Sequence, residues 1–195
     1  PGLAGMPLSG YGRCLFFRLD RKPCFDYNKH RFGYSCFFVA ADLCPNKNKK
    51  MNIIVTGSLG HISLPLVKTL VQQGHKVTVI SSDPGKQAAI AALGATAAIG
   101  SLEDPAFLQN TFTGADAVYT MVPPNNYFDP NLDLLAYYRR LGNNYAQAIE
   151  SSGVKRVVNL STIGADLEKG SGILLGAHDV AEILDRLPAA VTIIH

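Results

Sequence analysis

Gly57, Gly60 and Ser63 stand at intervals of three residues between a short apolar run and a segment with helical spacing. The run before them, 52–56, is rich in β-branched residues, which is typical of a buried strand. A glycine after a strand allows a tight turn, and a second glycine lets the backbone approach a phosphate closely. Unpaired N–H groups at the start of the next helix attract the same anion. The motif therefore indicates a pyrophosphate site for a dinucleotide. A plain strand-to-helix turn also fits, and Ser63 replaces the usual glycine.

The second predicted strand ends at side chains that could recognise the ribose of such a dinucleotide. An acidic residue there accepts a hydrogen bond from the 2′-hydroxyl of NAD, whereas a basic residue favours the 2′-phosphate of NADP. Ser81 and Ser82 suit either group, and Asp83 is better explained as the N-cap of the next helix. Lys86 could reach a 2′-phosphate or lie on a solvated helix face. We therefore predict NADP or NAD as the cofactor, with NADP favoured, and place Ser101, after the third strand, near the adenine.

These side chains need a scaffold, and from residue 51 onward the chain alternates apolar runs with helical segments. Three helices are expected to begin at Asp-Pro pairs, with Asp83, Asp104 and Asp129 as N-caps. His75, in a helix-to-strand turn, is expected at the surface. Strands are predicted at 52–56, 76–80, 95–99, 117–121, 156–160 and 190–194, and helices end near 73, 93, 111, 151 and 187. This alternation predicts an α/β fold, a doubly wound parallel (Rossmann) sheet of six strands in the order 3-2-1-4-5-6.

Aromatic residues follow the fourth predicted strand. Tyr127 and Phe128 lie in a loop at the carboxyl end of the sheet, where they could stack on a substrate or simply cover the cleft. Tyr138 and Tyr145 fall on the apolar face of the long helix that follows, so we expect them to face the core.

Four stretches of this scaffold resemble NmrA-like proteins, which are atypical short-chain dehydrogenase/reductases. They are Met51-Asn-Ile-Ile-Val-Thr-Gly-Ser-Leu-Gly-His-Ile, Ile99-Gly-Ser-Leu-Glu-Asp, Ala115-Asp-Ala-Val-Tyr and Gly153-Val-Lys-Arg-Val-Val-Asn-Leu-Ser161. The resemblance implies an oxidoreductase that moves a hydride from NAD(P)H to a quinone or related carbonyl acceptor; a non-catalytic NAD(P)-binding redox sensor is the alternative. It also implies cofactor contacts at Gly57, Ser58, Leu59, Gly60, His61 and Ile62, with Ser82 near the ribose and Met121, Val122, Pro123, Ser161 and Thr162 near the nicotinamide.

The resemblance places Ser161, just after the fifth strand, where active short-chain dehydrogenases carry a catalytic serine. The Tyr-x-x-x-Lys motif that typically follows is absent, because Tyr145 is the last tyrosine and Lys169 the last lysine. His178 and Glu182 lie one helical turn apart instead, and similar residues occur in quinone-reductase-like members. A quinone accepts a hydride without a tyrosine donor, so we predict Ser161, His178 and Glu182 as the catalytic set. The alternatives are a capping serine at the strand end and a surface histidine at the helix start.

Residues 1–50 differ in composition from the rest of the chain. They hold nine of the Lys and Arg residues against three Asp, and all four cysteines. They show no regular apolar period, and the cysteine spacing matches no zinc or redox pattern, so no metal site is predicted. We expect 1–50 to be an irregular extension outside the fold, whose removal leaves stability unchanged, and 51–195 to be an NAD(P)-binding domain. A basic arm for nucleic acid is the weaker alternative, because no nucleic-acid motif accompanies the charge.

The far end of the chain also bears on function. In the family that it resembles, a smaller region after the sixth strand covers the substrate cleft, and this sequence stops at His195. We therefore expect a C-terminally truncated member with most of its substrate subdomain missing, and an inactive fragment is a further alternative. No apolar run reaches the roughly 20 residues needed to span a bilayer, so we predict a cytoplasmic protein. Its expected partners are the dinucleotide and a small-molecule acceptor, and self-association is left open.

Overall fold

The computed structural model of the chain describes residues 39–40, 42–44, 49–127, 129–165, 167, 170 and 172–194. All of them belong to one compact unit, 32–195, and the other unit, 1–31, lies outside the described residues. No helix in the described ranges combines the length and the apolar character that a membrane span requires.

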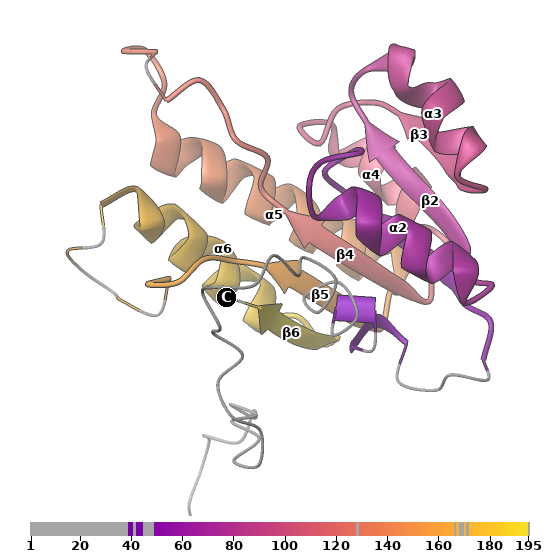
Figure 1. Cartoon of the computed structure of the whole chain (residues 1–195). Helices are drawn as coiled ribbons and strands as arrows, with labels where there is room; N and C mark the ends of the chain where they lie inside the picture. The colour runs from indigo at the N-terminus through magenta and orange to yellow at the C-terminus, as the bar shows by residue number, and fades with distance from the viewer. Residues whose placement is uncertain are drawn as a thin grey trace, which may run out of the picture. The chain divides into compact units, whose positions relative to one another are not determined.

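Six parallel strands form one sheet at the centre of this unit (Figure 1). In chain order they are β1 (Asn52–Val55), β2 (Lys76–Ser81), β3 (Thr96–Ile99), β4 (Ala117–Met121), β5 (Arg156–Leu160) and β6 (Ala190–Ile194). Their order across the sheet is β3-β2-β1-β4-β5-β6, and the central pair β1 and β4 is in register with Ile53 opposite Ala117. The doubly wound parallel sheet expected from the sequence is therefore confirmed.

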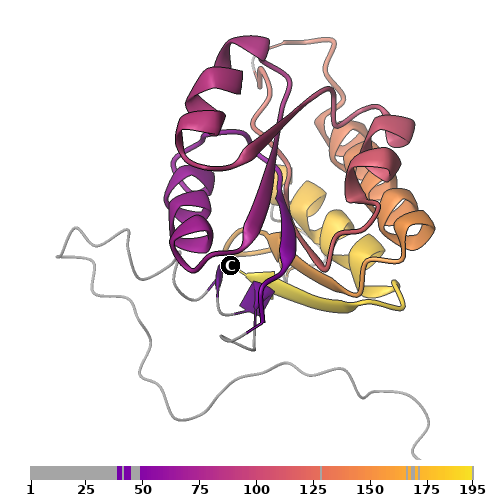
Figure 2. The same ribbon diagram turned by 90° about the vertical axis from the view of Figure 1, so that its right-hand side faces the viewer.

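Helices lie on both faces of the sheet (Figure 2). One face carries α2 (Ser63–Gln72), the short 3-10 turn η1 (Pro84–Lys86) and α3 (Gln87–Ala92). The other carries α4 (Pro105–Phe112), α5 (Leu134–Ser152), the 3-10 turn η2 (Gly172–Leu174) and α6 (Leu175–Asp185). Alternate residues of a strand point to opposite faces. Val55 therefore joins Leu66 of α2 in one apolar cluster, whereas Ile54 joins Tyr145 of α5 in the other.

The Asp-Pro pairs do not all begin α-helices. Asp104 caps α4 as expected, and its carboxylate accepts hydrogen bonds from two N–H groups of the first turn. Asp83 caps η1, which leads into α3. The expected helix start at Asp129 is wrong: α5 begins after Asp133, whose carboxylate accepts a hydrogen bond from an N–H of the first turn at 2.9 Å. Asp129 instead closes a separate turn by accepting from the N–H of Asn131.

The packed core extends upstream of residue 51. Arg156, at the start of β5, donates a hydrogen bond to the carbonyl of Asp42 at 3.4 Å. Four buried side chains from this upstream segment belong to the apolar cluster on the α2 face: Val39, Ala40, Leu43 and Cys44. The packed domain therefore starts before the boundary that was expected at residue 51. The sequence did not indicate this, because a few apolar residues in a segment without regular spacing leave no pattern to detect. The remainder of the expected extension, apart from 49–50, lies outside the described residues.

His75 is buried, which corrects its expected place at the surface. The residue is 6% exposed, and Nδ1 accepts a hydrogen bond from the N–H of Met51 at 3.3 Å. Burial, and after it the nearby ammonium group of Lys50, lowers the pKa of the imidazole. The turn after α2 is thereby tied to the residue that precedes β1.

Candidate dinucleotide and acceptor site

The turn between β1 and α2 requires glycine at its first position. Gly57 has a φ of 84°, and a Cβ there would collide with the sulfur of Met121 at the end of β4. Ser58 also has a positive φ, 54°, and its N–H donates to the carbonyl of Ile80 at 3.0 Å. A Cβ on Gly60 would meet only the carbonyl of Gly57, at 3.2 Å. The turn is therefore crowded where it faces β4 and open around its second glycine, where a ligand can approach the backbone.

Ser63 fills the third position of the motif with a buried hydroxyl. Its Oγ donates to the carbonyl of Thr56, directly after β1, at 3.1 Å. The helix α2 starts with no side-chain cap and with no acidic residue in its first turn, and Gly60 and His61 are exposed just before it. The N–H groups and the dipole at this helix start are thus suited to a phosphate anion. These residues fit the pyrophosphate of a dinucleotide.

A pair of serines ties the end of β2 to the glycine turn. The Oγ of Ser58 donates to the Oγ of Ser81 at 2.9 Å, and that oxygen also accepts from the N–H of Asp83 at 3.1 Å. Ser81 is only 3% exposed. Its hydroxyl therefore already has protein partners, and it fixes the shape of the turn.

The other residues expected around the adenosine lie nearer to solvent. Ser82 is exposed directly after β2, and Lys86 is half-buried in η1. Ser101 is exposed after β3, where its Oγ accepts from the N–H of Glu103 at 3.1 Å. All three stay predictions as adenosine contacts.

Met121 is held in place where β1 and β4 lie side by side. Helices that follow these two strands cover opposite faces of the sheet, and such a switch point is where open α/β sheets bind ligands. The N–H of Met121 donates to Thr56 Oγ1 at 3.0 Å, and its carbonyl accepts from the Tyr145 hydroxyl at 2.7 Å. Burial raises the pKa of the Tyr145 phenol, which keeps it protonated and able to donate. Val122 and Pro123 leave the sheet from this fixed point.

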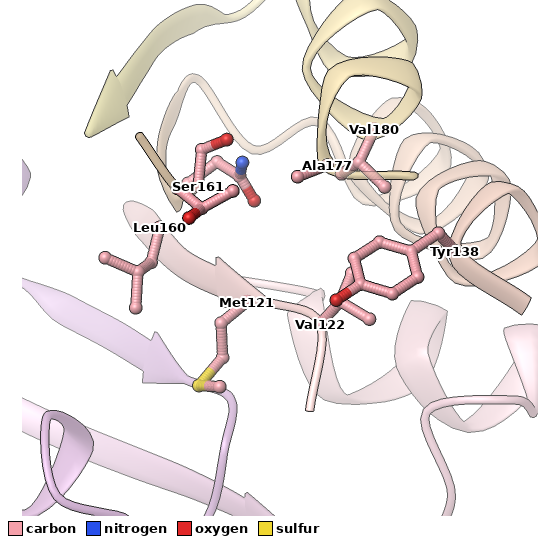
Figure 3. A pocket seen from close by; sticks show the side chains of 9 residues that line it. Met121, Val122, Tyr138, Leu160, Ser161, Ala177 and Val180 are labelled. Atoms are coloured by element: carbon pink, nitrogen blue, oxygen red, sulfur yellow. The ribbon is translucent and has the colours of Figure 1, made fainter. Parts of the chain in front are cut away.

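A pocket of about 100 Å³ lies at the carboxyl ends of β4 and β5, against α5 and α6 (Figure 3). It is lined by Met121, Val122, Tyr138, Asn159, Leu160, Ser161, Thr162, Ala177 and Val180. The Oγ of Ser161 is buried there and has no hydrogen-bond partner within the described part of the chain. Its N–H is anchored on the carbonyl of Ile194 at 2.7 Å. Buried hydroxyls are rarely left without a partner, so this one is available to a ligand in the pocket.

His178 and Glu182 lie on α6 but do not line this pocket. His178 Nδ1 is 2.9 Å from the carbonyl of Ala165, a contact that orients the ring. Glu182 is exposed and forms an ion pair of 3.8 Å with the arginine one helical turn further on. The structure therefore brings Ser161 and Thr162 together in the pocket and leaves His178 and Glu182 outside its walls.

Five pocket residues were not expected from the sequence, and two of them, Tyr138 and Asn159, carry polar groups. Tyr138 was assigned to the core, because its helical spacing fits an apolar face; it packs against the apolar cluster there and also reaches the pocket wall. Asn159 lies within β5, where its Oδ1 accepts from Thr120 Oγ1 at 3.0 Å. A polar residue inside an apolar strand is a signal that could have identified Asn159. Tyr127 is exposed in the loop after β4, and its neighbour Phe128 lies outside the described residues.

The sequence model of a family of NAD(P)H-binding proteins matches residues 57–191, from the glycine turn into β6. The chain belongs to this NAD(P)H-binding family. The match covers the glycine turn and the helix that fit a pyrophosphate, strands β2 to β5 and the start of β6. The expected resemblance to atypical short-chain dehydrogenase/reductases is confirmed at the level of an NAD(P)H-binding family. The cofactor is a nicotinamide dinucleotide.

Known relatives of this NAD(P)H-binding chain are distant. Sterol demethylase protein B of Methylococcus capsulatus is 28% identical over 116 residues, which cover 59% of this chain and 35% of that protein. The triphenylmethane reductase of Citrobacter sp., solved with NADP(H), has a TM-score of 0.59 and 18% identity over 73% of this chain and 48% of its own. The NADPH-dependent quinone oxidoreductase of Escherichia coli, solved with NADPH, has a TM-score of 0.58 and 20% identity over 72% of this chain and 47% of its own. The chain thus spans about a third of the curated relative and about half of the two reductases.

Proposed function

We propose that this chain is an NAD(P)-dependent oxidoreductase domain, which transfers a hydride from NAD(P)H to a quinone or related carbonyl acceptor. The observation that carries the proposal is the buried Ser161 hydroxyl, which has no partner in the described residues and faces a pocket beside the switch point. A hydroxyl in that place can donate a hydrogen bond to the oxygen of an acceptor. We place this activity in the cytoplasm and leave self-association open.

The residues of the glycine turn would hold the cofactor, which supplies the hydride chemistry when bound. Backbone groups of 57–62 would bind the pyrophosphate at the start of α2. Met121, Val122, Pro123 and Thr162 would flank the nicotinamide, because they lie at the carboxyl ends of β4 and β5, beside the switch point. The protein's contribution is to orient the acceptor and to exclude water around it.

NADP is the favoured form of the cofactor. The carboxylate of Asp83 accepts from the N–H of Gly85 at 2.8 Å, so it is engaged as a cap. Ser82 and the ammonium group of Lys86 are then the side chains near the end of β2 that could bind a 2′-phosphate. The two reductases of similar fold were solved with NADP(H) and NADPH, which supports the same choice.

A redox sensor that binds NAD(P) without turnover is the second candidate. The absence of a Tyr-x-x-x-Lys motif after Ser161 favours it. So does the position of His178 and Glu182 outside the pocket walls, although a catalytic role for both remains part of the enzyme proposal. An inactive fragment is the limiting form of this second candidate.

Cofactor binding is tested with a bulky side chain at the second glycine. Gly60→Trp should weaken the binding of NADPH by about tenfold or more, because the indole would fill the space through which a phosphate approaches the backbone. Gln72→Trp places the same bulk on an exposed residue at the far end of α2 and should leave binding unchanged. Affinity is read from the fluorescence of NADPH and NADH. Equal affinities in the parent chain and Gly60→Trp would show that the dinucleotide binds elsewhere.

Turnover separates the two candidate functions. We expect NADPH oxidation with a panel of quinones to depend on the chain and to fall in Ser161→Ala. NADPH binding without oxidation of NADPH by any acceptor would favour the sensor.

A further inference from the structure

Tyr138 directs a phenol into the pocket from the side opposite Ser161. Its side chain comes from α5, whereas Ser161 follows β5, and Figure 3 shows the two hydroxyl-bearing side chains on facing walls. The apolar side chains of Val122 and Leu160 also line the pocket. The pocket therefore presents the hydroxyl groups of Tyr138 and Ser161 to one small ligand from opposite sides.

The position of the Tyr138 ring is fixed by its neighbours on α5 and α6. A Cβ at Gly176 would lie 2.6 Å from the ring carbon Cγ, so the absence of a side chain there makes room for the tyrosine. The next residue on α5, Arg139, forms an ion pair with Asp179 of α6, with 2.7 Å between Nε and Oδ2. Tyr137 stands edge to face with Tyr138, with ring centroids 6.1 Å apart. The phenol is therefore held at the pocket by contacts on several sides.

Tyr138 is also connected to solvent. Burial, and after it the neighbouring Tyr127 phenol, raises the pKa of the Tyr138 phenol to about 12. Tyr127 is 48% exposed. The phenol is thus protonated at neutral pH, and a proton that leaves it can be replaced from water, because Tyr138 is only partly buried.

We propose that Tyr138 is the proton donor for the reduction of a neutral aldehyde or ketone whose oxygen binds between Tyr138 and Ser161. This proposal rests on the proposed oxidoreductase function and names the acceptor class. It gives the chain a phenol for the step that the missing Tyr-x-x-x-Lys motif would otherwise serve, from a different helix. The volume of about 100 Å³ limits the part of the acceptor inside the pocket to about one ring.

The step balances with these groups alone. The carbonyl carbon gains the hydride that NAD(P)H supplies, and the π electrons of the C=O bond move to its oxygen. That oxygen takes the proton of the Tyr138 phenol, so the carbonyl is reduced to an alcohol and NAD(P)H is oxidised to NAD(P)+. The phenolate regains a proton from water.

Two acceptors of similar size test the role of the phenol. Benzaldehyde needs a proton donor, because its reduction creates a localised alkoxide, whereas 1,4-benzoquinone gives an anion that the ring delocalises. Tyr138→Phe should lower the rate of benzaldehyde reduction by about 100-fold or more and change benzoquinone reduction by less than about threefold. Tyr137→Phe keeps the ring that stands beside Tyr138 and removes a hydroxyl outside the pocket lining. Its hydrogen bond to the carbonyl of Pro123 is long, at 3.5 Å, so both rates should stay close to those of the parent chain.

A binding measurement gives a readout that needs no turnover. The absorbance of 4-(dimethylamino)benzaldehyde shifts to the red when its carbonyl oxygen accepts a hydrogen bond. We expect this shift with the parent chain and Tyr137→Phe, and binding about threefold to tenfold weaker with a reduced shift in Tyr138→Phe. Circular dichroism of each variant establishes that the fold is retained.

The outcomes separate this inference from the proposed function. Reduction of benzoquinone with no reduction of benzaldehyde, or equal losses on both acceptors in Tyr138→Phe, would overturn the assignment of Tyr138 and leave the oxidoreductase intact. Binding of NADPH with no reduction of either acceptor would overturn the oxidoreductase and with it the proton donor. The absorbance shift would then decide whether Tyr138 binds a carbonyl at all.

Discussion

Ser81 and Ser161 show that the surroundings of a hydroxyl group decide what it can do. Both follow or end a parallel strand at the same edge of the sheet. Ser81 shares its oxygen between Ser58 and the backbone of Asp83, so it serves the shape of the glycine turn. Ser161 has its N–H anchored and its Oγ unpartnered among the described residues. A buried polar atom without a partner is costly, and this is the reason why we propose Ser161 as a contact for a ligand.

His75 makes stability depend on pH, because burial and then the nearby ammonium group of Lys50 lower the pKa of its imidazole in the folded chain. Its Nδ1 accepts from the N–H of Met51, which requires the neutral imidazole, and the folded-state pKa lies below the unfolded value of about 6.5. The unfolded chain therefore binds more protons below neutral pH, so the stabilisation is fully present above pH of about 6.5. It is lost as the pH falls towards the folded-state pKa.

We expect the free energy of unfolding in urea to fall between pH 7.5 and pH 5.5, and His75→Asn to flatten this dependence. The asparagine can still accept a hydrogen bond but does not titrate. His61→Asn, at an exposed position, is the matched control and should keep the slope of the parent chain. An unchanged slope in His75→Asn would assign the pH dependence to other groups.

At the scale of elements, local patterns predicted most of the fold. The strands and their order follow from short apolar runs separated by helices, because parallel strands buried on both faces need such runs. Packing between distant segments was not predictable in this way. The burial of His75 depends on Met51, and Tyr138 reaches the pocket because Gly176, far along the chain, leaves room for its ring. The start of α5 was predicted wrongly for a local reason. Asp129 and Asp133 are both good N-caps, and the proline after Asp129 favoured the first of them.

The start of α5 gives a direct test with two aspartates. Asp133→Ala should destabilise the domain by about 1 kcal/mol, because it removes the carboxylate that accepts from the first turn of α5. Asp129→Ala removes the same charge from the turn before it and should change stability by about 0.5 kcal/mol or less. Both values come from chemical denaturation at neutral pH. Equal losses would mean that the cap at Asp133 does not decide where the helix starts.

At the scale of the whole molecule, the buried residues of the segment around 39–44 place the start of the packed domain upstream of residue 51. The strands β4 to β6 have α5 and α6 on one face, whereas α2 and α3 lie beside β1 to β3 on the other. Val39 and Leu43 belong to the same apolar cluster as Tyr119 of β4 and Val158 of β5. The segment around 39–44 therefore buries apolar surface that the sequence alone assigned to an irregular extension.

This packing predicts that two truncations differ. A chain that begins at residue 39 should keep the stability of the parent, whereas a chain that begins at 51 should lose several kcal/mol, because burial of one Leu side chain alone contributes about 2 kcal/mol. Leu43→Ala in the full chain should cost about 2–5 kcal/mol, since the residue is 0% exposed. Asp42→Ala is the matched control, because its side chain is exposed and its carbonyl still accepts from Arg156.

Thermal and urea unfolding of these chains would decide between the two boundaries. Equal stability of both truncations and of Leu43→Ala would restore the boundary at residue 51 and leave the upstream segment without a structural role. Loss in the shorter truncation and in Leu43→Ala, with none in Asp42→Ala, would place the segment inside the folded domain. In that case cofactor binding should weaken together with stability, because β1 and the glycine turn rest on the same apolar cluster as Leu43.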